Sequence, residues 1–445
     1  MAESVEIVDL SDQLRPQQRE IAARMRRFSV LVCHRRFGKT VLMLLVLLSR
    51  ALDNRKTAPR YAYIAPYRVQ AKEVAWDYLK RFAGAIPGAE FNEGELRCDL
   101  PGGARIQLYG ADNPDRMRGL YLDGAVFDEY AQINPSTWTE IVRPMLTDRK
   151  GWAAFIGTVA GRDAFFRLYE HAKGQMADGN PDWFAALYRA SRTGIVDEAE
   201  LRDAAALMTS DEYDREFECD FDAAVPGTFY AQALREAEDS GRVGVVPWEP
   251  DRPVHTAWDI GFSDDTAIWF YQQVGRALHV IDFYASNGEG IGHYVNELQR
   301  RPYTYGKHFG PHDLRPKTMA SNGRSLWEQA KSLGCTFHIV PELGVNDGIN
   351  AVRRIMPRLW IDAEKCAAGL DALRLYRREW DDDKKAFKDK PLHDWTSHAA
   401  DAMRYLAVGY TEQRPDEFPG PPRSVPTWNE AAAMIDRGSR QREWA

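Results

Sequence analysis

The sequence predicts an α/β protein with two sheets, a parallel one in the N-terminal half and a mixed one in the C-terminal half. Three observations predict it. In the N-terminal half, short apolar strands alternate with helices at the spacing of strand–helix–strand units. The first strand leads into Gly38-Lys39-Thr40, which opens an apolar helix. After Pro253, three apolar strands follow one another across short turns, as in an antiparallel meander.

The chain of 445 residues is long for one core, so we expect two domains and a tail. The expected units are residues 1–225, with a helical linker or lid from about residue 165, residues 226–412, and a proline-rich tail with a short helix at 413–445. The net charge of −7 excludes a constitutively basic coat protein but leaves room for a local DNA track. No run reaches the ~18 apolar residues of a membrane span. The five cysteines form no CxxC pair, so we expect free thiols in the cytoplasm.

The first sheet is predicted to begin after a helix that starts near Leu14. An amphipathic helix is expected at 70–82, with Val74, Tyr78 and Phe82 on one face, and an apolar face of this kind is expected to be buried. Apolar runs predict the further strands of this sheet at 60–65, 104–108 and 153–158.

Beyond residue 165 the pattern becomes helical and charged as far as about residue 230. The clearest helices are expected at 197–207 and 210–217, with Thr209 or Ser210 as an N-cap. The proline-rich stretch 245–253 is interpreted as a linker or the beginning of the second domain.

The segment from Leu31 to Thr40 has the layout of a phosphate-binding loop. In such a loop, backbone N–H groups and a helix N-terminus point at a nucleotide's phosphates. Lys39 would reach the terminal phosphates, and the Thr40 hydroxyl would ligate Mg²⁺. Cys33 stands where the usual pattern has its first glycine, so the match departs at one residue.

A second motif is the apolar run at residues 125–127, which ends in Asp128 and Glu129. Beside the phosphate loop, Asp128 would hold the Mg²⁺ shell and Glu129 would polarise an attacking water. The alternative is a buried strand whose acidic end is merely solvated. The order of the two motifs and their separation of about 90 residues favour an ATPase.

The strands of the meander are expected at 254–260, 266–272 and 277–284. A meander with an aspartate in its first strand, here Asp259, is typical of the beginning of a ribonuclease-H-like fold. Two further carboxylates follow: Asp313 after a short strand, and Asp401 at the border of a helix stripe. The members of that buried stripe are Ala399, Met403, Leu406 and Tyr410.

Three converging carboxylates would bind one or two Mg²⁺ or Mn²⁺ ions and activate water for phosphodiester cleavage. The alternative is that these are surface charges: Asp259 solvated at an edge, Asp313 paired with Arg315, and Asp401 paired with Arg404. Residue spacing leaves both interpretations open.

Together these motifs resemble the large subunit of the tailed-phage terminases, the family of motor-nucleases that package DNA into procapsids. The resemblance runs from Leu14 to about Tyr410. It implies a P-loop (ASCE-type) ATPase domain with a parallel sheet and a ribonuclease-H-like, mixed-sheet nuclease domain. In this family, a residue other than glycine commonly opens the phosphate loop, as Cys33 does here.

For the N-terminal half, the resemblance implies ATP and Mg²⁺ as ligands. Glu129 and Arg35 would be catalytic, and Arg118 would be offered to the ATP of a neighbouring subunit. Gly157-Thr158 is similar to the motif that couples hydrolysis to movement. Gln18, with Gln17 as its neighbour, matches the adenine-contacting glutamine. The implied nucleotide-binding residues are Gln18, Arg35, Gly38, Lys39, Thr40, Asp128 and Thr158, with Thr40 and Asp128 at the metal.

For the C-terminal half, the resemblance implies that Asp259, Asp313 and Asp401 are catalytic and ligate Mg²⁺ or Mn²⁺. Possible additional groups are Asp264, Asp265, Asp282 and His398.

The implied function is ATP-driven translocation of double-stranded DNA into the procapsid, with metal-dependent cutting of concatemeric DNA. The implied partners are DNA, the portal protein, the small terminase subunit and further copies of the chain in a pentameric ring, with no membrane. The implied location is the host bacterial cytoplasm and, transiently, the portal vertex. The alternatives are a helicase-like translocase whose second domain only grips DNA, a nucleotide-gated assembly protein, and a recombinase or Holliday-junction nuclease.

Overall fold

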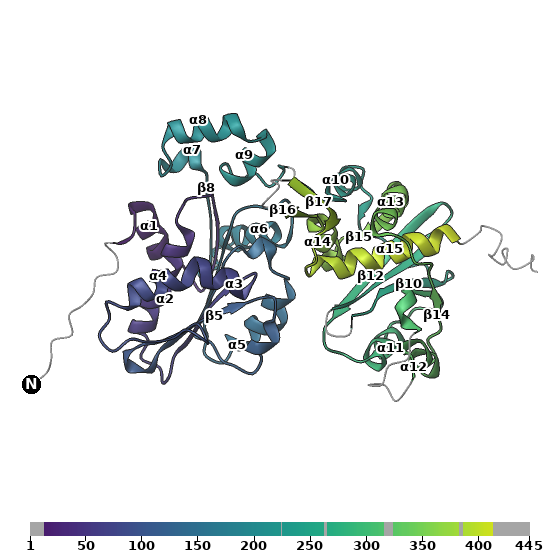
Figure 1. Cartoon of the computed structure of the whole chain (residues 1–445), viewed down its shortest axis with the longest axis horizontal. Coiled ribbons are helices and arrows are strands. Elements are labelled where there is room, and N and C mark those ends of the chain that lie inside the picture. The colour runs from purple at the N-terminus through teal and green to yellow at the C-terminus, as the bar shows by residue number, and fades with distance from the viewer. Residues whose placement is uncertain (1–12, 224, 262–264, 316–323, 382–385, 413–445) are drawn as a thin grey trace, which may run out of the picture.

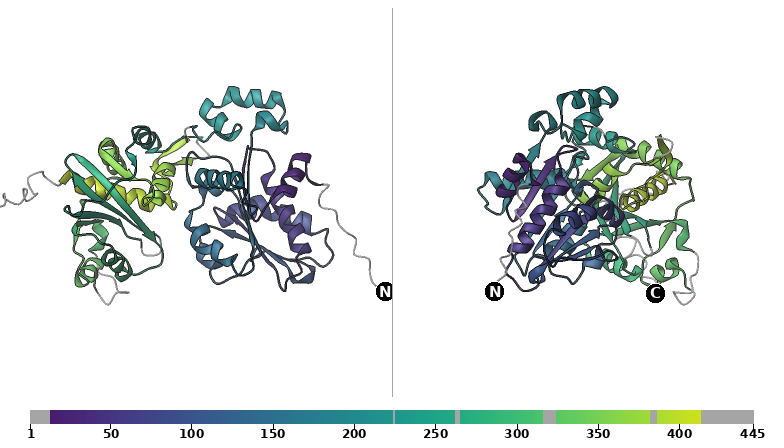
Figure 2. Two further views of the ribbon diagram at one scale, coloured as in Figure 1. Left: turned by 180° about the vertical axis from the view of Figure 1, so that it is seen from behind. Right: turned by 60° about the vertical axis from the view of Figure 1, so that its left-hand side comes forward.

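The structure is a computed structural model that describes residues 13–223, 225–261, 265–315, 324–381 and 386–412 (Figure 1). These residues form two lobes that lie side by side, each built around its own sheet (Figures 1 and 2). The α/β fold class with two sheets is confirmed. The tail at 413–445, including its expected helix, lies outside the described residues.

The first sheet has eight strands in the order β3-β4-β5-β2-β6-β7-β1-β8. Its six central and far-edge strands run parallel, as predicted, and β3 and β4 add an antiparallel hairpin at the other edge. The parallel strands are β1 (Phe28–Cys33), β2 (Arg60–Ala65), β5 (Arg105–Gly110), β6 (Gly124–Phe127), β7 (Trp152–Gly157) and β8 (Trp183–Tyr188). The hairpin strands are β3 (Glu90–Asn92) and β4 (Arg97–Asp99).

Helices cover both faces of this sheet (Figure 1). One face packs against α1 (Pro16–Arg24), α2 (Lys39–Asp53) and the segment α3 (Arg68–Ala71), η2 (Lys72–Trp76) and α4 (Asp77–Ala83). The other face packs against η6 (Thr137–Val142), α5 (Arg143–Met145) and α6 (Ala164–Ala177). All parallel strands therefore end at one edge, where ligands of open α/β sheets bind.

The expected buried face of the helix at 70–82 is wrong at two of its three positions. Val74 and Tyr78 are exposed, and only Phe82 is buried. The cause is the π-helical segment Lys72–Trp76, because its wider turn shifts the face by one residue and buries Ala75, Trp76 and Leu79 instead.

Above the strand ends lies a group of helices that we call the lid segment: α7 (Ala190–Thr193), α8 (Glu198–Leu207) and α9 (Ser210–Glu216). The two expected helices are confirmed, and Thr209 caps α9. The expectation of a helical pattern from residue 165 to about residue 230 is wrong at β8. This strand pairs with β1 along six residues, and tertiary pairing there overrides the local pattern.

The second sheet has the order β14-β13-β10-β11-β12-β15-β9. The predicted meander β10 (Val254–Asp259), β11 (Thr266–Val274) and β12 (Ala277–Ser286) is confirmed as antiparallel. The remaining strands are β13 (Tyr305–Gly310), β14 (Phe337–Ile339), β15 (Leu359–Asp362) and β9 (Val243–Gly244), which pair in parallel. The sheet is therefore mixed, as the fold class requires.

One face of the second sheet packs against four helices, α10 (Ala231–Asp239), α13 (Val345–Ile355), α14 (Ala367–Leu375) and α15 (Thr396–Glu412). The opposite face packs against α11 (Ile291–Arg300) and α12 (Leu326–Ser332). A separate hairpin, β16 (Arg378–Asp381) and β17 (Ala386–Pro391), precedes α15. The predicted stripe of α15 is confirmed: Ala399, Met403 and Leu406 are buried, and Tyr410 packs against the same core.

The stretch 245–253 runs along the second sheet, where Val246 N–H donates to Asp362 and Glu249 N–H donates to Gln272. It therefore lies inside the second lobe. The division into units at residue 225 stays a prediction.

The lobes contact one another through side chains on either side. Arg167 of α6 forms a bidentate ion pair with Asp371 of α14. Trp395 Nε1 donates to the Gln132 carbonyl at 3.1 Å. All five cysteines are buried and none pairs with another. Among the described residues, no helix is both long and apolar enough to cross a membrane.

Candidate functional sites

The phosphate-loop motif forms the turn between β1 and α2 at the edge where the parallel strands end. Gly38 adopts φ +88°, and a Cβ there would lie 2.6 Å from Gln18 Nε2. Only glycine fits both the left-handed backbone and this close approach. The loop thus presents the N-terminus of α2, beginning at Lys39, to the space above the sheet.

Lys39 and Glu129 come together across this space. Lys39 Nζ donates to the Cys33 carbonyl at 3.3 Å and lies 3.9 Å from Glu129 Oε1. Glu129 follows β6 with φ +48°, and its Oε2 accepts from the Thr158 N–H at 3.2 Å and the Thr158 hydroxyl at 3.3 Å. The structure therefore joins three of the predicted residues in one network: Lys39, Glu129 and Thr158.

Asp128 is the buried member of the acidic pair. Tyr63 donates a hydrogen bond to Oδ2, and the Glu129 N–H donates to Oδ1 at 3.0 Å. Burial and the neighbouring Glu129 charge raise the pKa of Asp128 to about 6. Thr40 also forms a hydrogen bond with Tyr63, so the two predicted Mg²⁺ ligands, Thr40 and Asp128, share one tyrosine as a hydrogen-bond partner. A buried carboxylate next to another carboxylate gains from a cation, so this donor set fits Mg²⁺.

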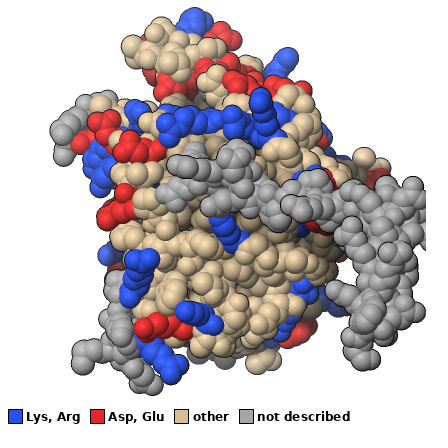
Figure 3. All heavy atoms as spheres, turned by 90° about the vertical axis from the view of Figure 1, so that its right-hand side faces the viewer, with Lys and Arg blue, Asp and Glu red and all other residues tan. Residues whose placement is uncertain are grey.

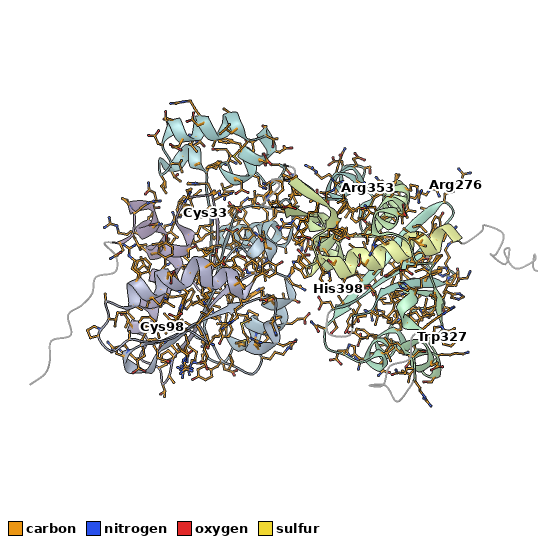
Figure 4. The ribbon with its side chains drawn as sticks, in the orientation of Figure 1. Cys33, Cys98, Arg276, Trp327, Arg353 and His398 are labelled. Carbon is orange, nitrogen blue, oxygen red and sulfur yellow. The ribbon has the colours of Figure 1, made fainter. Side chains whose placement is uncertain are left out.

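The second site forms where β10 ends against the first turn of α15. Asp259 Oδ2 lies 3.0 Å from His398 Nδ1. Asp401 pairs with Arg404 at 2.6 Å, and burial raises the pKa of Asp401 to about 6, to which the Asp259 charge adds. The structure therefore brings Asp259 and Asp401 together near His398. His398 lies at the beginning of α15 (Figure 4).

Asp313 follows β13 in a single helical turn, η7 (His312–Leu314), and its side chain lies outside what the structure describes. Because β13 pairs in parallel with β10 and Phe309 lies opposite Ala257, its chain position is beside the end of β10. Within the described residues, no group of three His, Cys, Asp or Glu side chains is spaced to hold a metal.

The sequence offered three other acidic candidates, Asp264, Asp265 and Asp282. Asp264 lies outside the described residues, and Asp265 accepts from Asn134 of the first lobe at 3.5 Å. Asp282 faces the opposite side of the sheet, where it binds Arg301 and Tyr303. The interpretation of Asp401 and Arg404 as an ion pair is correct, but the pair is mostly buried instead of lying on the surface.

The family model described as "Terminase large subunit, T4likevirus-type, N-terminal" matches residues 32–173. The terminase large subunit of Thermus virus P23-45 is 30% identical over 139 residues, covering 27% of this chain and 29% of that protein. That of Escherichia phage T5 is 21% identical over 327 residues, covering 71% of each. The chain is similar in sequence to phage terminase large subunits, most clearly in its N-terminal part.

The match to the first two relatives is short: the chain spans 29% of the Thermus virus P23-45 protein and 19% of that of Thermus phage G20c. Among solved structures, the large terminase of bacteriophage HK97 aligns over 89% of this chain and 94% of its own, at 14% identity and a TM-score of 0.43. That score is low, and the fold assignment rests on the strand orders given above.

Three residues implied by the likeness to terminase large subunits have other partners in this structure. The Gln18 amide is buried and donates to the carbonyls of Phe37 and Gly38, so it supports the loop. The Arg35 guanidinium lies 3.7 Å from Glu216, with 66% of its side chain exposed. Arg118 pairs with Asp115 at 2.5 Å, and 57% of its side chain is exposed. The adenine, γ-phosphate and neighbouring-subunit roles stay predictions. Gln17 donates to the Thr193 carbonyl.

Two residues in contact with the nucleotide-site motifs were not singled out from the sequence, Tyr63 and His34. Tyr63 orients Asp128, and its position in β2 beside β6 is apparent only once the strand order is known. His34 lies within the loop motif and is fully buried. The signal for His34 is a titratable side chain within a loop that would close on phosphates.

Proposed function

We propose that this chain is a DNA-packaging motor-nuclease: an ATPase that translocates double-stranded DNA and a metal-dependent endonuclease that cuts it. The observation that carries the proposal is the network of Lys39, Glu129 and Thr158 above the strand ends. It links a phosphate-binding lysine to an acid that would orient water, and that acid to the end of a neighbouring strand. The family match over residues 32–173 supports the same function.

In the proposed reaction, Lys39 and the N–H groups at the start of α2 bind the ATP phosphates. Thr40 and Asp128 would hold Mg²⁺, which supplies charge neutralisation at the β- and γ-phosphates. Glu129 orients the attacking water, and Arg35 in cis and Arg118 from a neighbouring copy stabilise the transferring phosphoryl group. When Glu129 binds the attacking water, its hydrogen bonds to Thr158 would break. Because Thr158 lies between β7 and α6, ATP hydrolysis would then change the position of these two elements.

In the second lobe, Asp259 and Asp401, with Asp313, would hold one or two Mg²⁺ or Mn²⁺ ions, which supply Lewis-acid activation of water. The mutual repulsion of Asp259 and Asp401 supports a cation site, because a cation between them relieves it. His398 orients Asp259 through its Nδ1.

Contacts to DNA would be made to phosphates, because a motor must pass any sequence. The face of the second lobe that points away from the first carries a row of Lys and Arg side chains despite the net negative charge of the chain (Figure 3). Arg353 and Arg354 lie in the last turn of α13 in this lobe. The portal protein, the small subunit, a ring of copies and the host cytoplasm belong to this proposal.

A second candidate function keeps the motor and makes the second lobe a non-cutting DNA grip. The observation that favours it is the Asp401–Arg404 pair, in which a guanidinium already neutralises one of the carboxylates. The two functions differ in one assay: incubation of the full chain with supercoiled plasmid and Mn²⁺. Linear or fragmented product favours the nuclease, and intact plasmid with active ATP turnover favours the grip.

The motor assignment is tested by Glu129→Gln, which keeps the size of the side chain and removes the base. ATP turnover in the presence of linear double-stranded DNA should fall by about 10²- to 10⁴-fold. Displacement of a triplex-forming strand, which reports translocation, should stop with it. Glu200→Gln, on the exposed side of α8, serves as the matched control. Unchanged turnover in Glu129→Gln would refute the motor function.

A further inference from the structure

His34 is a buried histidine inside the phosphate loop, and the mechanism proposed above does not use it. Its ring is 0% exposed, and both ring nitrogens are engaged. Nδ1 lies 2.6 Å from the Arg35 carbonyl oxygen, and Nε2 lies 2.9 Å from the Thr193 hydroxyl oxygen. Thr193 ends α7 of the lid segment, so this ring connects the loop to a helix far along the chain.

The next residue, Arg35, is fixed from both sides by these contacts. Its carbonyl accepts from the His34 ring, and its N–H donates to the Glu216 carbonyl at 2.7 Å. Glu216 ends α9, the other end of the lid segment. The backbone of Arg35 is therefore held between the loop and the lid segment, while its guanidinium stays mostly exposed.

We propose that His34 is a positioning residue for ATP hydrolysis, which sets Arg35 by bonding the phosphate loop to Thr193 of the lid segment. This inference rests on the proposed ATPase function. A movement of the lid segment would reach Arg35 by two routes, the His34 ring bonded to Thr193 and the Glu216 carbonyl, and through Arg35 it would reach the phosphates.

The chemistry of the ring fits this link. Burial lowers the pKa of His34, with the charges of Lys39 and Arg15 adding to the effect, so the ring is neutral near neutral pH. Because a carbonyl only accepts, Nδ1 carries the hydrogen and donates to Arg35. Nε2 is then the acceptor, and the Thr193 hydroxyl donates to it. One neutral tautomer satisfies both contacts.

The test compares Thr193→Val, which keeps the shape but removes the donor, with Thr193→Ser, which keeps the donor. Thr193→Val should lower kcat for ATP about two- to tenfold, the range of one neutral hydrogen bond, and leave KM within about twofold. Thr193→Ser should stay near wild type. His34→Asn, which keeps the reach to Arg35 and loses that to Thr193, should match Thr193→Val. In an Arg35→Ala background, Thr193→Val should change kcat no further.

A purely structural role would lower thermal stability without this split between kcat and KM and without dependence on Arg35. Equal losses from Thr193→Val in the two backgrounds would overturn the proposal.

Hydrogen exchange in the nucleotide-free full chain separates failure of the inference from failure of the ATPase function. Thr193→Val should speed exchange of the peptide that contains the Arg35 amide, while Thr193→Ser should not. Unchanged exchange in Thr193→Val overturns the link even if the chain hydrolyses ATP. If exchange is faster in Thr193→Val but the wild-type chain shows no ATP turnover, the link between His34 and Thr193 is supported and the ATPase function is rejected.

Discussion

Both acidic sites are built from carboxylates, but they are assembled differently. In the first lobe, Asp128 and Glu129 are consecutive residues at the end of one strand, and each is held by a neighbour from an adjacent strand, Tyr63 or Thr158. In the second lobe, Asp259 lies on a strand and Asp401 on a helix, and the two residues are about 140 positions apart in the sequence. There, His398 and Arg404 from the same helix hold them.

This difference decides how each site responds to change. The first site is fixed by a short motif and by parallel strand pairing, so its geometry is independent of the second lobe. The second site depends on how α15 docks on β10, and Trp395, just before α15, bonds to Gln132 of the first lobe. The first lobe therefore contacts the element that carries half of the second site.

The comparison predicts that Asp259 and Asp401 act as one pair. Asp259→Asn should reduce cutting of supercoiled plasmid in Mn²⁺ by about 100-fold or more, because a metal ligand and its charge are lost together. Asp401→Asn should do the same. ATP turnover should stay at the wild-type level in both variants.

Asp282→Asn is the matched control, because this carboxylate lies on the opposite face of the sheet and binds Arg301. It should leave cutting within about threefold of wild type. A loss in Asp282→Asn as large as that in Asp259→Asn would mean that the site lies elsewhere, and the contrast between the two lobes would fail.

The nucleotide site could be predicted from sequence more fully than the second site. Lys39, Thr40, Asp128 and Glu129 lie in two contiguous motifs, and parallel strand ends meet at one edge, so their proximity follows from pattern alone. For the second site, the sequence could not show that Asp282 lies on the opposite face of the sheet from Asp259. Which face of β12 it takes depends on the register with β11, which shifts between Phe270 and Tyr271.

The fold could be predicted from the sequence where a strand is defined by the hydrophobic pattern of its own residues. Strand β2 and the meander agree with their expected positions, because short apolar runs bounded by turns define them. Strand β8 was missed, since an edge strand inside a charged, helical stretch is formed by its pairing with β1. The buried face at Val74 and Tyr78 was wrong because a π-helical turn leaves no mark in a 3.6-residue pattern.

The contact between the lobes gives a smaller effect. Arg167→Ala should lower the free energy of unfolding by about 2 kcal/mol, since Asp371 is only 1% exposed and loses its bidentate partner. This loss is smaller than that for a buried carboxylate left with no cationic partner, because Arg374 Nη1 remains 3.2 Å from Asp371. The Arg167 side chain is also 44% exposed, which weakens its ion pair. Urea denaturation of the full chain measures it.

Arg162→Ala breaks an ion pair with Asp222 in which both side chains are more than half exposed. This control should stay within about 0.5 kcal/mol of wild type. Equal effects of the two substitutions would mean that the lobes are not held together by Arg167.

The smallest predicted effect concerns Asp163, a buried carboxylate beside that contact. Its Oδ1 caps α6 by accepting from the Phe166 N–H, and its Oδ2 has no hydrogen-bond partner among the described residues. Burial raises the pKa of Asp163 to about 7, and the Asp371 charge adds to the rise. Because the folded pKa lies above the unfolded one, folding favours the protonated acid. The resulting stability is present in acid and is lost as the pH rises through about 7.

Asp163→Asn keeps the cap and removes the titration, because asparagine accepts the same N–H bond. The free energy of unfolding of the wild type should fall by about 1 kcal/mol more than that of the variant between about pH 6 and pH 7. Parallel urea titrations of the two proteins across this range measure the difference. If the free energy of unfolding has the same pH dependence in both proteins, Asp163 is ionised at both ends of the range. Arg167 would then neutralise Asp163 as well as Asp371, and the contact between the lobes would hold two ionised acids instead of one.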